Sequence, residues 1–229
     1  MENQTFTSDL PSALTPEEAR VLGCLLEKEI ATPEYYPMTL NALTNACNQK
    51  SNRRPAMDLS TEDVQEALDS LREKKLAMIV SVADSRVPKF KRLTERLGDP
   101  DLAERAVLCE LLVRGPQTAG ELRNRCDRLR PFVGIEEVEK VLKELEDAPP
   151  GPLVRKLPRQ PGHKESRYVQ LLTGEPEETV VAGVEAPVAA APRASLQGRI
   201  EALEKEVAEL RAENATLRET FEEFRRQFE

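Results

Sequence analysis

Residues 15–30 read TPEEARVLGCLLEKEI and predict the first helix of a unit that occurs twice in the chain. Thr15 is a typical helix N-cap, Pro16 suits the first helical position, and two acids follow in the first turn. Apolar residues then recur at spacings of three and four, as in an amphipathic helix. Because residues 107–112 repeat the apolar pattern of residues 21–26 at an offset of 86, we infer an internal duplication.

Each unit is predicted to contain three helices followed by a β-hairpin. In the first unit we expect a second helix over residues 40–47, a third helix over residues 60–71 and a hairpin within residues 76–93. The second unit keeps this order with shorter loops and ends in a hairpin within residues 153–172.

This order is typical of the winged-helix variant of the helix-turn-helix motif, and an α+β pair of unrelated topology is the alternative. The predicted fold class is therefore mainly α with small β-hairpins (α+β), with two tandem winged-helix domains followed by a C-terminal coiled-coil helix. The expected boundaries are a flexible N-terminus at 1–13, winged-helix domain 1 at 14–97, winged-helix domain 2 at 98–173, a disordered Pro/Ala-rich linker at 174–195 and a coiled-coil dimerisation helix at 196–229.

The last segment carries apolar residues at spacings that alternate between four and three, which defines the seam of a coiled coil. Its flanking charges would attract one another across a parallel pair, so we expect a parallel homodimer. Packing of this helix against the globular domains is the alternative. The expected dimer interface consists of Leu196, Ile200, Leu203, Val207, Leu210, Asn214, Leu217, Phe221, Phe224 and Phe228.

Composition argues against an enzyme or a metal protein. The chain has 229 residues, a net charge of −8, one histidine and four cysteines without the close pairing of a zinc site. It has no Gly-rich phosphate loop, HExxH or GxSxG motif. We therefore expect buried structural thiols, no catalytic residue, no cofactor and no metal. Without a membrane-spanning apolar run or a targeting signal, the predicted location is cytoplasmic, with no membrane partner.

Residues 36–53, YPMTLNALTNACNQKSNR, resemble the signature of the bacterial YceH family of uncharacterised proteins, and so do residues 14–23. The resemblance covers roughly residues 12–173 and implies a tandem winged-helix fold without an established activity or catalytic residues. Arg54 departs from the family pattern, in which we expect an acid before Pro55.

Charge is distributed unevenly over the predicted units. The third helix of each unit is acidic, which disfavours its insertion into the DNA major groove, whereas the loops and hairpins are basic. We therefore predict a transcriptional-regulator-like protein that binds double-stranded DNA through hairpins and basic loops. The candidate residues are Lys50, Arg53, Arg54, Arg86, Lys89, Lys91, Arg92, Arg123, Arg125, Arg128, Arg155, Lys156, Arg159, Lys164 and Arg167.

Three further alternatives remain open. The acidic helices could bind a protein partner, which would make the chain a protein-interaction scaffold without direct DNA binding. The basic residues could be solvated or paired with neighbouring acids rather than form one continuous electropositive strip. An amide-rich group could read bases or could hydrogen-bond to its own backbone: Asn41, Asn45, Asn48, Gln49 and Asn52.

Overall fold

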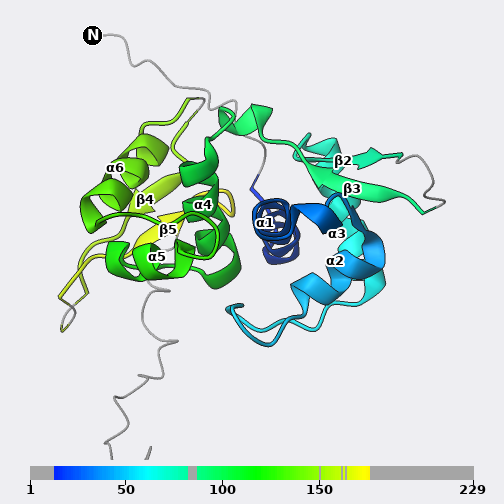
Figure 1. The fold of residues 1–229 in the computed structure, drawn as a ribbon, viewed down its shortest axis with the longest axis horizontal. Helices are drawn as coiled ribbons and strands as arrows, with labels where there is room; N and C mark the ends of the chain where they lie inside the picture. Colours follow the sequence, from blue (N-terminus) through cyan, green and yellow to red (C-terminus); the bar gives the residue numbers. More distant parts are fainter. Residues whose placement is uncertain (1–12, 82–86, 150, 161, 163, 176–229) are drawn as a thin grey trace, which may run out of the picture. The chain divides into compact units, whose positions relative to one another are not determined.

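The computed structural model describes residues 13–81, 87–149, 151–160, 162 and 164–175. Within these residues the chain forms a mixed α+β fold with six α-helices and two small antiparallel sheets (Figure 1). Several predictions fall on residues outside the described ones: residues 1–12 of the predicted flexible N-terminus, residues 176–195 of the predicted linker, the predicted coiled-coil helix at 196–229 with its ten interface residues, and the candidate cation Arg86.

We call the elements from α1 to β3 the first repeat and those from η2 to β5 the second repeat. The first repeat consists of α1 (Pro16–Ala31), the 3-10 helix η1 (Pro33–Tyr35), β1 (Met38–Thr39), α2 (Leu40–Cys47), α3 (Thr61–Glu73), β2 (Ala77–Val80) and β3 (Lys89–Arg92). The second repeat consists of the 3-10 helix η2 (Glu95–Leu97), α4 (Leu102–Arg114), α5 (Ala119–Cys126), α6 (Ile135–Glu146), β4 (Val154–Lys156) and β5 (Tyr168–Gln170).

Local sequence signals explain where the helices begin. Helices α1, α3, α4 and α5 each begin with a capping box. The N-cap side chain accepts a hydrogen bond from the backbone N–H three residues later, and the acidic side chain at that later position accepts one from the N-cap backbone N–H. These starts confirm the predicted helices and their order in both repeats.

The sheets contain one strand that the sequence did not predict. Strand β3 pairs with β2 as the expected hairpin, and the two-residue strand β1 pairs with the other edge of β3. In the second repeat β4 pairs with β5, and Gln117 forms an isolated bridge with Tyr168. Since both additions lie just before the second helix of their repeat, they make the two repeats more alike.

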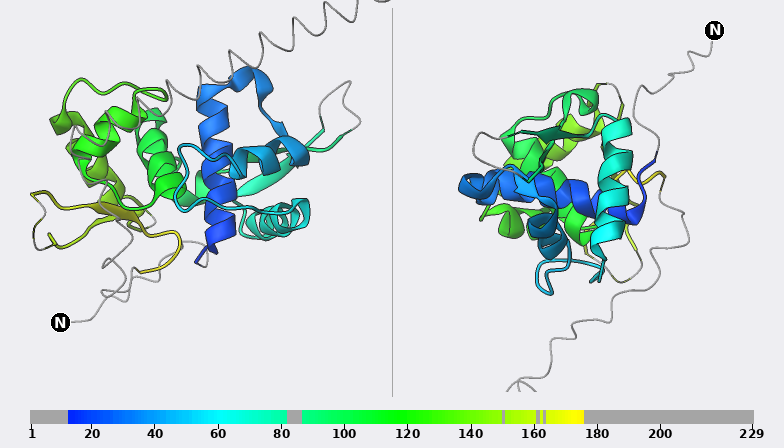
Figure 2. Two further views of the ribbon diagram at one scale, coloured as in Figure 1. Left: turned by 90° about the horizontal axis from the view of Figure 1, so that it is seen from below. Right: turned by 90° about the vertical axis from the view of Figure 1, so that its right-hand side faces the viewer.

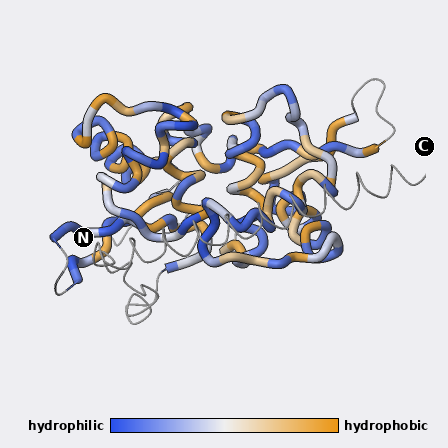
Figure 3. Tube along the Cα trace, turned by 60° about the horizontal axis from the view of Figure 1, so that its bottom comes forward, coloured by the Kyte–Doolittle hydropathy of each residue, from blue (hydrophilic) through white to orange (hydrophobic). Residues whose placement is uncertain are grey.

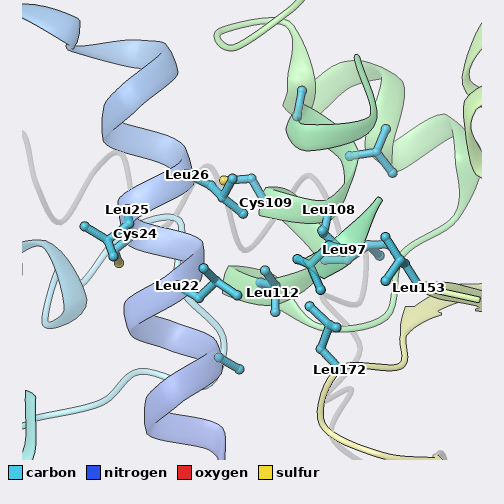
Figure 4. Packing of buried hydrophobic residues seen from close by; sticks show 14 of the residues in the cluster. Leu22, Cys24, Leu25, Leu26, Leu97, Leu108, Cys109, Leu112, Leu153 and Leu172 are labelled. Atoms are coloured by element: carbon cyan, nitrogen blue, oxygen red, sulfur yellow. The ribbon is translucent and has the colours of Figure 1, made fainter. Parts of the chain in front are cut away.

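Helices α1 and α4 form the centre of the described unit, where the two repeats meet (Figure 2). Both helices are buried on most of their circumference because each also packs against helices of its own repeat. Leu22 and Leu26 of α1 lie beside Cys109 and Leu112 of α4, whereas Leu25 points towards the rest of the first repeat (Figure 4). One hydrophobic core therefore runs through both repeats.

Figure 3 shows apolar stretches in the helices of both repeats, interleaved with polar ones, as expected for elements that bury one face. The four cysteines are buried and free, as predicted for structural thiols. Among the described helices, none combines the length and the apolarity that crossing a bilayer requires.

Candidate nucleic-acid interface

The exposed faces of α3 and α6 are acidic, as the sequence predicts. Helix α3 contains five acids and one base, and α6 contains five acids and two bases. Most of these carboxylates are exposed: Glu62, Asp63, Glu66 and Glu73 on α3, and Glu136, Glu139 and Glu144 on α6. Because these faces would repel phosphate, neither helix is suited to the major groove.

Six of the candidate cations are ion-paired with carboxylates of the protein itself. The N···O separations quoted below fall between 2.5 and 3.4 Å, within the range of direct ion pairs. The pairs are Arg53 with Glu27, Arg92 with Glu29 (2.6 Å), Arg125 with Glu121 (3.4 Å), Arg128 with Glu27 (2.5 Å), Arg155 with Glu175 (2.8 Å) and Arg167 with Glu121 (3.4 Å).

Arg53 is the clearest correction to the sequence-based assignment. Its side chain has no exposed surface, and its guanidinium donates to Glu27, to the Ala46 carbonyl oxygen at 3.2 Å and to Gln49 Oε1 at 3.0 Å. Burial alone would lower the pKa of Arg53, but its hydrogen bond to Glu27 raises it above the ordinary value. Arg53 therefore stabilises the interior and cannot contact a phosphate in this structure.

Eight candidate cations form no ion pair within the part of the chain that the structure describes. We call them the unpaired cations. They lie on the loop after α2, on β3, on α5 and on the β4–β5 hairpin, and six of them are exposed while the two on β3 are half-buried. They are Lys50, Arg54, Lys89, Lys91, Arg123, Lys156, Arg159 and Lys164.

These cations do not form the expected continuous strip. The β2–β3 hairpin and the β4–β5 hairpin lie on opposite sides of the α1–α4 pair (Figures 1 and 2). Among the candidate cations, Arg53 is buried and Arg125 is paired, while Lys89 and Lys164 belong to these separate hairpins. The expectation of one strip was wrong because pairing and burial depend on tertiary contacts.

Asn48 and Asn52 of the amide-rich group form hydrogen bonds within the fold. Asn48 Nδ2 donates to the Leu59 carbonyl oxygen and Asn48 Oδ1 accepts from the Leu59 N–H, both at 2.8 Å. Asn52 Oδ1 accepts from Arg114 Nη2 at 2.7 Å. The alternative in which these amides hydrogen-bond to backbone is therefore confirmed for Asn48. Asn52 instead accepts from a side chain of α4.

The structure also shows a buried group of charges where the repeats meet, which the sequence analysis did not identify. The carboxylates of Glu27 in α1 and Glu110 in α4 have no exposed surface. Arg128 Nη2 lies 2.5 Å from Glu27 Oε1 and 3.0 Å from Glu110 Oε1, and Arg114 Nε lies 2.7 Å from Glu110 Oε2. A signal existed for Glu110, which interrupts the apolar run of residues 107–113, whereas Glu27 is followed by the charged Lys28 and Glu29 and is not distinguished in the sequence.

The ionisation of Glu27 follows from these neighbours. Burial alone would raise its pKa, but the hydrogen bond from Arg53 and the charges of Arg53 and Arg128 hold the pKa of Glu27 below its ordinary value. Glu27 is therefore a carboxylate at neutral pH. Among the described residues, no three His, Cys, Asp or Glu side chains are grouped so that they could hold a metal ion.

Comparison with known sequences places residues 14–163 in a family described as "Protein of unknown function, DUF480". The UPF0502 protein GSU0233 of Geobacter sulfurreducens is 54% identical over 219 residues, which cover 94% of this chain and 98% of the relative. The UPF0502 protein VPA1223 of Vibrio parahaemolyticus is 49% identical over 205 residues, with 87% and 92% covered. These names state no activity.

Proposed function

Since the chain belongs to the DUF480 family, which is described as a family of unknown function, we propose its role from its own residues: a regulator-like protein of tandem winged-helix type that binds double-stranded DNA. The order of three helices and a hairpin in each repeat supports the winged-helix assignment. The sequence resemblance to the YceH family also supports a tandem winged-helix fold.

The observation that carries the proposal is the set of eight unpaired cations. A cation that already pairs with a carboxylate must lose that partner before it can bind phosphate, whereas an unpaired surface cation only exchanges its hydration and counterions. Lys50, Arg54 and Arg123 are exposed on loop and helix surface, and three more cations are exposed on the β4–β5 hairpin.

The proposed contact is led by the hairpins and basic loops. Residues 154–170 contain five basic side chains and one acid, whereas the neighbouring helix α6 has an excess of acids. Duplex DNA would therefore be held by its phosphates at the hairpins and kept away from α3 and α6. Such contacts position a protein on DNA and carry little sequence information by themselves.

We further propose that the protein is cytoplasmic and forms a parallel homodimer through the coiled coil at 196–229. Two copies would double the number of hairpins available to one duplex, which strengthens binding through effective concentration.

A salt titration tests the proposal. Binding of the full chain to a random-sequence duplex, measured by fluorescence anisotropy, should weaken steeply as salt rises. Each neutralised phosphate contributes about −0.9 to the slope of log K against log salt, so eight contacts in one chain would give roughly −7. Absence of binding to the duplex at a low salt concentration of about 20 mM would refute the proposal.

A protein-interaction scaffold is the second candidate, and one observation favours it. Val133 is 91% exposed and Ile135 is 43% exposed where the chain enters the acidic helix α6. An apolar pair beside carboxylates would suit a partner segment that is both basic and apolar. A chain that fails to bind duplex at low salt but binds a peptide of this composition would support the scaffold.

A further inference from the structure

The junction between the repeats combines apolar packing with a buried ionic group. Gly23 in α1 allows α4 to approach closely, and the Cys109 thiol donates to the Gly23 carbonyl oxygen at 3.4 Å. At the ends of these helices, Arg53, Arg114 and Arg128 surround the carboxylates of Glu27 and Glu110. We call these five residues the junction cluster.

Within the junction cluster, Arg128 has a role that the other arginines do not share. Arg53 pairs with Glu27 inside the first repeat, and Arg114 pairs with Glu110 inside the second. Arg128 follows α5 in the second repeat, yet it pairs with Glu27 of the first repeat as well as with Glu110. Its guanidinium therefore bridges one carboxylate from each repeat.

Neighbouring hydrogen bonds cross the junction in the same place. Arg114 Nη2 donates to Asn52 Oδ1 at 2.7 Å, and the Arg54 backbone N–H donates to the Val113 carbonyl oxygen at 2.9 Å. The loop after α2 is thereby attached to the end of α4. Directional contacts thus join the repeats on the side where the junction cluster lies.

An apolar contact alone would hold the repeats together but would not require a charged cluster. Burying a carboxylate is costly unless it is paired, and a well-packed apolar side chain is often at least as stabilising. What Arg128 adds is a requirement for one geometry, because its guanidinium meets both carboxylates only when the repeats take one relative orientation.

We propose that the Arg128–Glu27 ion pair is a positioning contact that fixes the orientation of the two repeats, so that both basic hairpins meet one DNA duplex. The first half of this statement concerns the protein alone. The second half rests on the proposed DNA-binding function.

The experiment compares two arginine variants of the full chain. Arg128→Gln removes the ionic bridge between Glu27 and Glu110 but leaves Glu27 with Arg53, Glu110 with Arg114 and the neighbouring hydrogen bonds across the junction. Arg125→Gln is the matched control, because it removes the same charge from an arginine of similar exposure that pairs with Glu121 inside one repeat. Circular dichroism verifies that both variants fold.

The orientation is measured without DNA. Nitroxide labels at Glu66→Cys in α3 and Glu139→Cys in α6 report the distance between the repeats by pulsed electron paramagnetic resonance, and the four native cysteines are buried and remain unlabelled. The distance distribution should broaden or shift in Arg128→Gln and stay unchanged in Arg125→Gln. Arg128→Lys, which keeps the charge, should restore part of the narrow distribution. Identical distributions in all variants would overturn the proposal.

DNA-binding measurements distinguish the orientation of the repeats by Arg128 from the binding of both hairpins to one duplex. If both hairpins hold one duplex, Arg128→Gln should weaken binding by roughly tenfold or more through lost effective concentration, and Arg125→Gln should weaken it less. A changed distance distribution with equal effects of both variants on affinity would refute the shared-duplex half. A changed distribution in a chain that binds no DNA would refute the proposed function and retain the positioning contact.

Discussion

Gly23 in α1 and Cys109 in α4 are equivalent positions of the two repeats, 86 residues apart, and they touch each other: the Cys109 thiol donates to the Gly23 carbonyl oxygen at 3.4 Å. Equivalent residues meet in this way when two copies of a unit pack about an approximate two-fold axis. The central helices of the two repeats therefore pair much as the subunits of a symmetric dimer do.

Substitution of Gly23 by alanine should destabilise the protein. A Cβ atom at this position would lie 2.7 Å from Val113 Cγ1 and 3.0 Å from Leu112 Cβ, so α1 and α4 must move apart. Overpacking of this kind costs about 1–3 kcal/mol, which urea denaturation measures. The control is Gly120→Ala in α5, where the added Cβ meets nothing closer than 3.9 Å. Equal losses in both variants would contradict this account of the junction.

Asn48→Ala should also destabilise the protein, because Asn48 forms two hydrogen bonds at 2.8 Å with the backbone of Leu59. Removing both leaves partly buried backbone groups without a partner, and we expect a loss of about 1–3 kcal/mol in the free energy of unfolding. Asn45→Ala on the exposed side of α2 should change it by a few tenths of a kcal/mol, about the difference in helix propensity. A loss at Asn45 that matched the loss at Asn48 would show that the bonds to Leu59 do not matter.

Alkaline pH should destabilise the fold through its buried thiols. Burial raises the pKa of Cys126 to about 12, and burial likewise raises the pKa of Cys109, from an ordinary value of 9.0. The folded chain therefore keeps protons that the unfolded chain releases, so the contribution of these thiols to the free energy of unfolding should be fully present below about pH 8 and be lost as the pH rises above 9. The slope approaches roughly 1.4 kcal/mol per pH unit for each such thiol.

Cys126→Ala tests this dependence through its slope. The variant is less stable at every pH because it leaves a cavity, but its free energy of unfolding should fall less steeply between pH 9 and 10 than that of the parent chain. Urea denaturation at a series of pH values provides both slopes. Parallel curves would mean that Cys126 does not titrate differently in the folded and unfolded chain.

Helices and hairpins were predictable because their signals are local. The N-cap Ser60 and the apolar spacing after it predicted α3, which the structure places at Thr61–Glu73. Strand β1 was not predictable, since two residues carry no period and their pairing with β3 depends on a distant segment.

The sequence predicted which basic residues could bind phosphate, but it did not predict which of them already pair with an acid of the fold. Lys156 and Arg155 are neighbours in a basic hairpin, yet Arg155 pairs with Glu175 while Lys156 lies over the ring of Tyr168, with Nζ 5.5 Å from its centroid. Whether a cation is free depends on which acid the fold brings near it. Sequence spacing does not contain that information for partners in other elements.

Removal of the cations from the second hairpin should reduce the salt dependence of DNA binding. In the triple variant Lys156→Ala, Arg159→Ala and Lys164→Ala, the salt slope should become shallower by about 2.7, which corresponds to three lost phosphate contacts. The reason is that these cations form no ion pair in the described chain and are free to bind phosphate. A matched triple variant on the acidic helices removes the same charge from residues that pair with Asp69, Glu144 and Asp147: Arg72→Ala, Lys140→Ala and Lys143→Ala. Its slope should stay unchanged, because these residues face no phosphate in a hairpin-led complex. Equal slopes for the two triple variants would mean that net charge, and not the hairpin, determines binding.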